Sequence, residues 1–258
     1  MQTLKIITLL CLLIANPLVV AHATAEATAE TKAKETVLIT GANRGIGLAL
    51  AEQFLAKGYR VIGTARTPSK ASELKQLGAA VEKLDVADQS SVDALAKRLE
   101  KTTIDIVINN AGIVGHNEKS FSDLNIDAIQ NTFNVNTLGP LRVTQGLLAN
   151  LAQSKRKLVV NISSRMGSME ANTWGCCIAY RASKAALNSA NKTLAVDMKD
   201  QGLTFVVLHP GYVKTDMNSG EGDYTAQQSA SGLVKVILGL SPSDSGKFYD
   251  HLGEQLAW

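Results

Sequence analysis

Residues 37–47 read Val-Leu-Ile-Thr-Gly-Ala-Asn-Arg-Gly-Ile-Gly, and this stretch decides the fold. Its first four residues predict a buried strand, and residues 46–56 have the apolar spacing of a helix. Between them, Gly41 allows a tight turn, Gly45 lets the backbone approach a pyrophosphate, and Gly47 lets the helix pack closely on the sheet. The spacing is G-x-x-x-G-x-G rather than G-x-G-x-x-G. The strand, the glycines and the helix together therefore favour nucleotide binding at the helix N-terminus over a purely structural turn.

The end of the second expected strand indicates which nucleotide is preferred. An acidic residue at that point would accept the 2′-hydroxyl of NAD. This chain has Thr64-Ala65-Arg66 there instead. Arg66 and Arg44 are suited to a 2′-phosphate, because guanidinium groups match phosphate geometry. The alternative is two solvated surface arginines. The charge pattern predicts NADP(H) in preference to NAD(H).

Apolar runs alternate with helical stretches from residue 36 onward. Strands that are apolar along their whole length imply a parallel sheet that is covered on both faces. We therefore expect an α/β fold, a doubly wound Rossmann sandwich with a mostly parallel sheet of about seven strands, in one domain at 36–258. Asp88 is the expected N-cap of one helix. Expected strands are 37–40, 60–64, 80–84, 104–108, 158–162 and 204–208, and expected helices are 46–56, 69–77, 88–101, 123–154 in two segments and 179–200.

Residues 1–23 differ in character from the rest of the chain. One positive charge precedes the apolar run 6–14, and small residues spaced A-x-A follow at 21–25. This pattern predicts a signal peptide and export to a periplasm, the exterior or an organelle lumen. An uncleaved anchor is the alternative, and it would retain the domain at a membrane, with the cytoplasmic side still possible. Residues 24–35 read as a disordered spacer. Free NADPH is supplied in the cytosol, so export would separate the protein from its expected cofactor.

Composition excludes some functions. The formal charge is +3, and the basic residues are scattered rather than arranged in the stripe that nucleic-acid binding requires. The histidines are dispersed, so no metal-ligand spacing is present. Cys176 and Cys177 are adjacent, which is poor geometry for a mutual disulfide. The expected partner is a small molecule, with no nucleic acid and no metal.

Tyr180 and Lys184 lie four residues apart and so share one face of the expected helix. A phenol with a pKa near 10 is a poor acid or base at neutral pH. A fixed ammonium one turn away should favour the phenolate and lower that pKa. The pair is therefore a candidate acid/base unit, although an ordinary helix surface carries the same spacing by chance.

Five motifs in order make the chain resemble the short-chain dehydrogenase/reductase family, and in particular its C-factor or sniffer-type carbonyl reductase subgroup. The match runs from about residue 36 to the C-terminus. The motifs are Thr40 to Gly47 (T-G-x-x-x-G-x-G), Asn109 to Gly112 (N-N-A-G), Asn136, Ser164 before Tyr180 and Lys184 (Y-x-x-x-K), and Pro210-Gly211 with Thr215.

The resemblance implies the cofactor-binding residues. Asp85 would contact the adenine, the Asn109–Gly112 segment would line the cleft, and the segment that follows the sixth strand would hold the nicotinamide carboxamide. Residues 217–230 would form a mobile substrate loop. The full expected set is Gly41, Asn43, Arg44, Gly45, Ile46, Gly47, Arg66, Asp85, Asn110, Ala111, Gly112, Tyr180, Lys184, Pro210, Gly211, Val213 and Thr215.

The resemblance also implies the catalytic roles. Tyr180 would donate a proton to the carbonyl oxygen, Ser164 rather than Ser163 would orient that oxygen, and Lys184 would lower the tyrosine pKa and bond the nicotinamide ribose. Asn136 would hold a water that links Lys184 to solvent. The segment between Ser164 and Tyr180 is longer than is usual in the family. Its extra residues, around 168–177, would border the substrate pocket. Cys176 and Cys177 either line that pocket or are buried small side chains.

These roles describe an NADP-dependent oxidoreductase that transfers a hydride between nicotinamide and a small-molecule carbonyl or alcohol. The alternative is a nucleotide-binding sensor or C-factor-like signalling protein with little turnover. Family analogy also suggests a homodimer or homotetramer that pairs the helices at 136–154 and 179–200.

Overall fold

Seven parallel strands form the sheet in the computed structural model, which describes residues 34–115 and 121–258. The strand order is β3-β2-β1-β4-β5-β6-β7. The predicted signal peptide and most of the predicted spacer lie outside the described residues. The strands are β1 (Thr36–Ile39), β2 (Arg60–Ala65), β3 (Ala80–Lys83), β4 (Ile106–Asn109), β5 (Leu158–Ile162), β6 (Thr204–His209) and β7 (Phe248–Asp250).

Alternate residues of each central strand enter two separate hydrophobic cores, because successive side chains of a strand point to opposite faces. In β1, Val37 and Ile39 belong to one core and Leu38 to the other. Both faces are covered, so the predicted doubly wound sandwich is confirmed.

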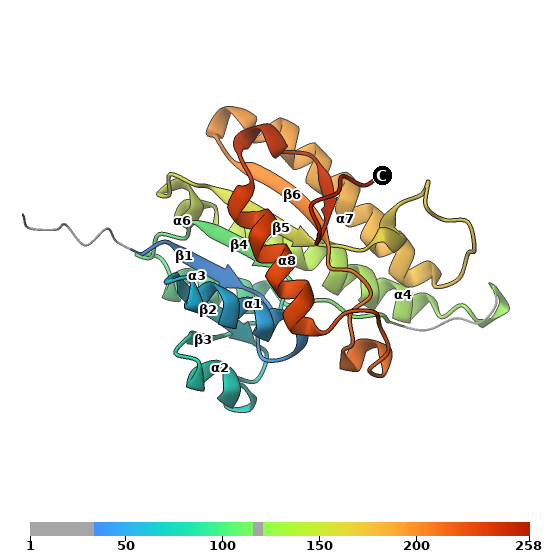
Figure 1. Ribbon diagram of the computed structural model, residues 1–258, viewed down its shortest axis with the longest axis horizontal. Coiled ribbons are helices and arrows are strands. Elements are labelled where there is room, and N and C mark those ends of the chain that lie inside the picture. The colour runs from blue at the N-terminus through green and yellow to red at the C-terminus, as the bar shows by residue number, and fades with distance from the viewer. Residues whose placement is uncertain (1–33, 116–120) are drawn as a thin grey trace, which may run out of the picture. The chain divides into compact units, whose positions relative to one another are not determined.

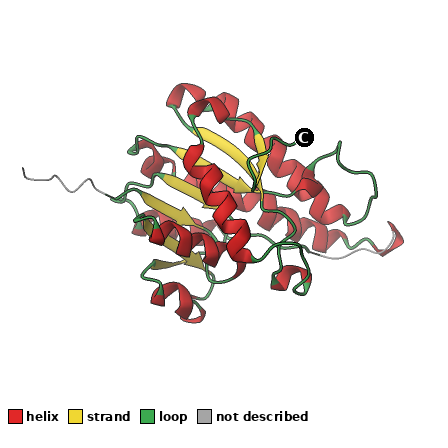
Figure 2. Ribbon diagram, viewed as in Figure 1, coloured by secondary structure: helices red, strands yellow, loops and turns green. Residues whose placement is uncertain are grey.

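Helices α1 (Gly45–Ala56) and α8 (Ala226–Gly239) pack on one face and cross in front of the sheet in Figure 1, with α2 (Ser72–Gln76) beside them. On the other face lie the remaining helices, and Figure 2 shows the strands between the two layers. They are α3 (Gln89–Arg98), α4 (Ile126–Phe133), α5 (Gly139–Gly146), α6 (Leu148–Ala152) and α7 (Ile178–Asp197).

Some helix boundaries differ from those predicted. The expected helix at 69–77 divides into a 3-10 turn, Pro68–Lys70, and α2, because Ala71 leaves the helical region. The expected helix at 123–154 begins at Ile126 and contains a π turn, Asn134–Leu138. There Gly139 N donates to Asn134 O, five residues back, and the following Pro140 has no N–H to donate.

Other local predictions hold. Asp88 caps α3, and its side chain accepts a hydrogen bond from Ser90 N at 2.9 Å. The long helix expected at 179–200 is α7 followed by the 3-10 turn Lys199–Gln201. Among the described residues, no helix has the length and apolar character needed to cross a membrane.

The core between α1 and the sheet depends on Phe54, which is fully buried and meets the ring of Tyr59 edge-on at 5.3 Å. We expect Phe54→Ala to lower the free energy of unfolding by about 3–5 kcal/mol, through lost burial and the cavity left behind. Replacing the exposed Glu52 of the same helix by alanine should change it by no more than about 0.5 kcal/mol. Urea titration of both variants measures the difference, and equal losses would contradict this account of the core.

Candidate functional site

A cleft of about 630 Å³ opens at the carboxyl ends of the strands, where parallel α/β sheets bind ligands. β1 and β4 lie side by side there although β2 and β3 separate them in sequence, which makes this position the switch point of the sheet. Segments that follow six strands line the cleft, together with two residues of α7. Of the predicted residues, the lining includes Gly41, Asn43, Arg44, Gly45, Ile46, Gly47, Arg66, Asp85, Asn110, Ala111, Gly112, Tyr180, Lys184, Pro210 and Thr215.

Of the predicted site residues, Ser164, Asn136, Gly211 and Val213 are not among the lining residues, whereas Ser163 is. Gly211 has φ +86°, and a Cβ there would lie 3.0 Å from both Tyr224 and His251. Val213 is buried, and its carbonyl accepts a hydrogen bond from Asn218 Nδ2 at 3.0 Å. Both residues shape the loop after β6 through packing and the main chain.

The glycine turn leaves space for a ligand close to the backbone. Gly41 and Gly45 have φ values of +64° and +55°, which L side chains rarely adopt. A Cβ at Gly47 would collide with the carbonyl oxygen of Gly41 and lie 2.6 Å from Asn110 Nδ2. The chain therefore folds into a cradle that any side chain at this position would disrupt, and a dinucleotide pyrophosphate fits it.

Hydrogen bonds tie this turn to the end of β4. Asn110 Nδ2 donates to Thr40 O at 2.9 Å and to Gly41 O at 3.2 Å. Thr40 Oγ1 accepts from the main-chain nitrogens of Asn110 and Ala111, each at 3.0 Å. The cradle and the opposite wall of the cleft consequently form one rigid unit.

The two predicted phosphate arginines are exposed at the cleft, but only one of them is paired with an acidic residue in the described chain. Arg44 Nη1 lies 2.9 Å from Asp216 Oδ2, in the loop after β6. Exposed pairs of this kind contribute about 0–1 kcal/mol, so the bridge is easily exchanged for another anion. Sequence reasoning missed Asp216, which lies 172 positions along the chain from its partner.

The side chains of Tyr180 and Ser164 approach each other, and this interaction lowers the pKa of the tyrosine. Tyr180 belongs to the first turn of α7, and Ser164 follows β5. Ser164 Oγ also accepts from Met166 N at 3.1 Å, which fixes its side chain. Ser163 Oγ instead makes a long 3.5 Å hydrogen bond to the main-chain oxygen of Lys184. The geometry thus pairs the second serine with the tyrosine.

Burial changes the acidity of both members of the Tyr180–Lys184 pair. It raises the pKa of Tyr180, and the hydrogen bond with Ser164 acts in the opposite direction. It lowers the pKa of Lys184 to about 8. The prediction that Lys184 lowers the tyrosine pKa is wrong for this structure. The lysine ammonium donates to Ile162 O at 2.9 Å and lies 5.8 Å from the centre of the tyrosine ring.

Asn136 is fully buried within the π turn. Its Oδ1 accepts from Ile113 N at 2.8 Å, and its Nδ2 donates to Ile113 O at 2.8 Å and Ser183 Oγ at 3.0 Å. A Cβ at Gly112 would lie 3.3 Å from Asn136 Oδ1 and 3.6 Å from Lys184 Nζ. The amide therefore holds the segment after β4 beside the lysine, and its expected role with a water stays a prediction.

A chain of buried amides fixes α7 to the sheet. Asn109 Nδ2 donates to Asn161 Oδ1 at 2.9 Å, and Asn161 Nδ2 donates to Asn191 Oδ1 at 2.9 Å. Asn191 Nδ2 then donates to Phe205 O at 3.4 Å. Sequence reasoning missed Asn161 and Asn191, although an asparagine inside an apolar strand is a signal that a buried partner exists.

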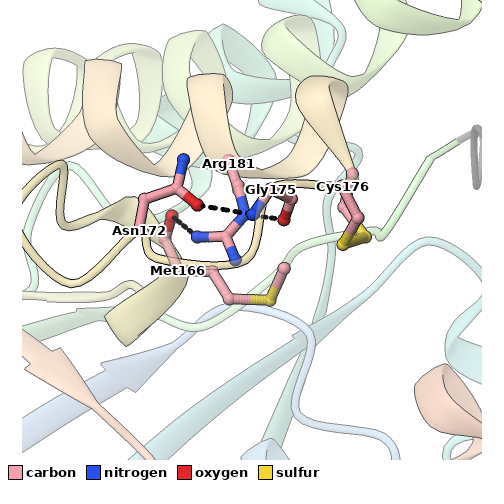
Figure 3. Close-up of a disulfide and its surroundings, with 6 residues drawn as sticks. Met166, Asn172, Gly175, Cys176 and Arg181 are labelled. Carbon is pink, nitrogen blue, oxygen red and sulfur yellow. Dashed lines mark hydrogen bonds between the residues drawn. A yellow bond between two sulfur atoms is a disulfide. The ribbon is translucent and has the colours of Figure 1, made fainter. Parts of the chain in front are cut away.

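Arg181 organises the segment between Ser164 and Tyr180 (Figure 3). Its Nε donates to Gly175 O at 2.9 Å and its Nη1 to Met166 O at 3.3 Å. Its guanidinium lies 4.3 Å from the ring centre of Trp174. Sequence reasoning assigned no role to Arg181. Its position directly after Tyr180 was the signal that could have indicated a role near the site.

Cys176 and Cys177 form a disulfide, so the prediction that their adjacency prevents one is wrong. An extended chain would point successive side chains to opposite sides. Both cysteines are left-handed, with φ values of +64° and +57°, and this turn brings the two sulfurs together. Cys176 is exposed rather than buried.

The C-terminal residues pack beside this same segment. The ring of Trp258 stacks on Phe248 at 5.5 Å. Its main-chain oxygen accepts hydrogen bonds from Ser168 Oγ at 3.0 Å and Met169 N at 3.1 Å. The start of the 168–177 segment is therefore anchored to the edge strand β7.

Comparison with known proteins agrees with this geometry. Residues 35–225 match the family described as short chain dehydrogenase. The "C-signal" of Myxococcus xanthus is 43% identical over 155 residues, which cover 60% of this chain and 93% of that protein. The "1-hydroxy-2-glutathionyl-2-methyl-3-butene dehydrogenase" of a Rhodococcus species is 36% identical over 230 residues, covering 86% of this chain and 99% of that one.

Solved structures are similar over most of the chain. The NADPH-bound carbonyl reductase from chicken fatty liver has a TM-score of 0.80 and 32% identity, covering 87% of this chain and 99% of that chain. The carbonyl reductase Sniffer of D. melanogaster has a TM-score of 0.83 and 30% identity, covering 87% and 100%.

The buried Lys184 should make stability depend on pH. An unfolded lysine titrates near 10.5 and the folded one at about 8, so the unfolded chain binds more protons between these values. The free energy of unfolding should therefore rise with pH across this window, by about 3 kcal/mol from this group. Lys184→Met should lose that rise, whereas Lys192→Met, at an exposed position of the same helix, should keep it. Urea titrations at pH 7.5, about 9 and about 10.5 measure the slope, and equal slopes in the two variants would contradict the assignment.

Proposed function

Because the chain belongs to the short-chain dehydrogenase family, and is therefore an oxidoreductase of carbonyl and alcohol groups, we propose that it is an NADP(H)-dependent reductase of small-molecule carbonyl compounds. The observation that carries this proposal is the placement of Tyr180 and the buried Lys184 in a cleft built on a glycine cradle, with Ser164 beside the tyrosine.

The phenol of Tyr180 is the candidate proton donor for reduction of a carbonyl. It is protonated at neutral pH, and burial, which raises its pKa, makes it a weaker acid until an oxygen that gains negative charge arrives beside it. Ser164 Oγ orients the same oxygen through a hydrogen bond. The nicotinamide supplies the hydride when it is bound. The protein supplies the proton, the orientation and the partly closed cleft.

Lys184 suits the restoration of that proton. A lysine with a pKa of about 8 carries its proton at neutral pH, yet releases it more readily than an ordinary lysine does. Because burial raises the pKa of Tyr180 and lowers that of Lys184, the lysine ammonium is the stronger acid of the two. This order of acidities favours proton transfer toward the phenolate that each reduction leaves behind.

The preference for NADP(H) rests on the end of β2. Ala65-Arg66-Thr67 supplies a cation and no carboxylate where NAD-specific sites hold an acidic residue. Arg66 lines the cleft, and so does Arg44, which belongs to the glycine cradle. The similar chicken carbonyl reductase binds NADPH, which supports the same choice.

Tyr180→Phe should abolish NADPH-dependent reduction while NADPH still binds, because the variant loses only the proton donor. Loss of a positioned general acid costs about 10²–10⁴-fold in turnover. Tyr59→Phe, at the amino end of β2 and outside the cleft lining, should keep full activity. NADPH oxidation at 340 nm with a panel of aldehydes, ketones and quinones measures turnover, and NADPH fluorescence measures binding. Retained turnover in Tyr180→Phe would remove Tyr180 from its catalytic role.

The relative named "C-signal" makes a signalling protein with little turnover the second candidate function. The same assay separates the two functions. Tight NADPH binding by the wild-type protein, with no turnover of any compound in the panel, would favour a nucleotide-dependent signal. The filled positions of Ser164, Tyr180 and Lys184 favour catalysis.

Arg66→Ala should weaken NADPH binding by about tenfold or more and leave NADH binding unchanged, since a charge-assisted hydrogen bond contributes about 1.5–3 kcal/mol. Arg60→Ala is the matched control, because Arg60 is exposed at the amino end of the same strand, away from the cleft. Fluorescence titration with each nucleotide gives both dissociation constants. A parallel loss for NADPH and NADH would show that Arg66 does not read the 2′-phosphate.

A further inference from the structure

The disulfide between Cys176 and Cys177 lies where the substrate-side segment becomes helix α7 (Figure 3). Cys177 is the N-cap of α7, and Tyr180 follows in the first turn. Cys176 is exposed, so a thiol in solution can reach its sulfur. The roles proposed above for the nucleotide cradle and the proton-transfer residues leave this bond without an assigned function.

The backbone around the disulfide adopts a conformation that ordinary residues avoid. Gly175, Cys176 and Cys177 have φ values of +72°, +64° and +57° in succession. Only glycine adopts this region without a steric cost, and two consecutive cysteines there need a constraint that holds them. The covalent ring formed by the two side chains is such a constraint, and cleaving it allows both residues to return to right-handed or extended conformations.

Direct contacts connect this segment to the catalytic turn. Cys177 O accepts the hydrogen bond from Arg181 N at 2.9 Å, which begins α7. Gly175 O accepts from Arg181 Nε at 2.9 Å, and Gly175 N donates to Asn172 Oδ1 at 3.1 Å. A change of backbone conformation at the cysteines therefore disturbs two of the hydrogen bonds that Arg181, the residue next to Tyr180, donates.

We propose that Cys176–Cys177 is a thiol–disulfide exchange site that sets the conformation of the substrate-side segment, residues 168–177, and of the first turn of α7. A thiolate of a small dithiol attacks the exposed sulfur of Cys176, the Cys176–Cys177 bond breaks, and a mixed disulfide forms. The second thiolate of the dithiol then displaces Cys176. The dithiol is oxidised to its disulfide, and the two cysteines take up its two electrons and two protons.

The catalytic consequence rests on the proposed function. In the oxidised protein the first turn of α7 is fixed, and Tyr180 stays beside Ser164. In the reduced protein the turn loosens, and kcat/KM should fall by about tenfold or more, because small displacements of a catalytic group are costly. NADPH binding should change little, since neither cysteine is among the residues that line the cleft.

The test compares the oxidised full-length protein with the same protein reduced by dithiothreitol, using peptide mass and hydrogen exchange. Reduction should add the mass of two hydrogen atoms to the peptide that contains residues 176 and 177. It should also speed amide exchange at Gly175 and Arg181, and leave exchange in α1 unchanged. The Cys176→Ser/Cys177→Ser variant should exchange fast with or without reductant. Cys11→Ser, which removes the remaining cysteine of the sequence, should respond as the wild type does.

Each outcome has a defined meaning. An unchanged peptide mass, or equal exchange at residues 175–181 in both states, overturns the exchange site. Faster exchange with unchanged kcat/KM overturns its effect on catalysis. Faster exchange in a protein that turns over nothing in either state supports the exchange site and counts against the proposed function alone. If the double variant does not fold, the dithiothreitol titration of the wild type gives the same answers.

Discussion

The hydrogen bond from Asn161 on β5 to Asn191 on α7 fixes the position of α7 against the sheet, and the site depends on that position. Both amides are buried, and they continue a chain that starts at Asn109 on β4. Moving α7 along the sheet would leave these groups unpaired, at about 1–3 kcal/mol for each one. Tyr180 and Lys184 stand on α7, and Ser164 follows β5, so the same chain sets the tyrosine–serine contact. The fold thus secures its reactive groups with polar bonds where apolar packing alone would tolerate sliding.

Burial has opposite effects on the two titratable groups of α7. It favours the neutral form of each, and so raises the pKa of Tyr180 while it lowers that of Lys184 to about 8. In water the phenol is slightly the stronger acid, with an ordinary pKa of 10.0 against 10.5 for the ammonium. In the cleft this order is reversed. A spacing of four residues could not disclose the reversal, because it depends on how deeply the fold buries each group.

The sequence allowed the sheet, its two covered faces and most of the cleft lining to be predicted, because these features follow from apolar strands and from glycines at fixed offsets. The strand β7 could not be predicted from its three residues, since only pairing with β6 defines it. The π turn that contains Asn136 directly precedes Gly139 and Pro140, and the disulfide joins two left-handed residues. Neither conformation has a local apolar signal. The pairing of Arg44 with Asp216 is equally invisible to local patterns, because only the folded sheet brings the two residues together.

That pairing gives Arg44 two competing demands. It stands on the glycine cradle, where a nucleotide phosphate would attract it, and it holds Asp216 in the turn Asp216–Asn218. Since an exposed bridge contributes about 0–1 kcal/mol, a doubly charged phosphate would displace Asp216 at little cost. The turn that carries Met217 at the cleft would then lose its tie to the cradle. On the proposed function, one arginine therefore couples the occupancy of the nucleotide site to the freedom of the loop after β6 that lines the cleft.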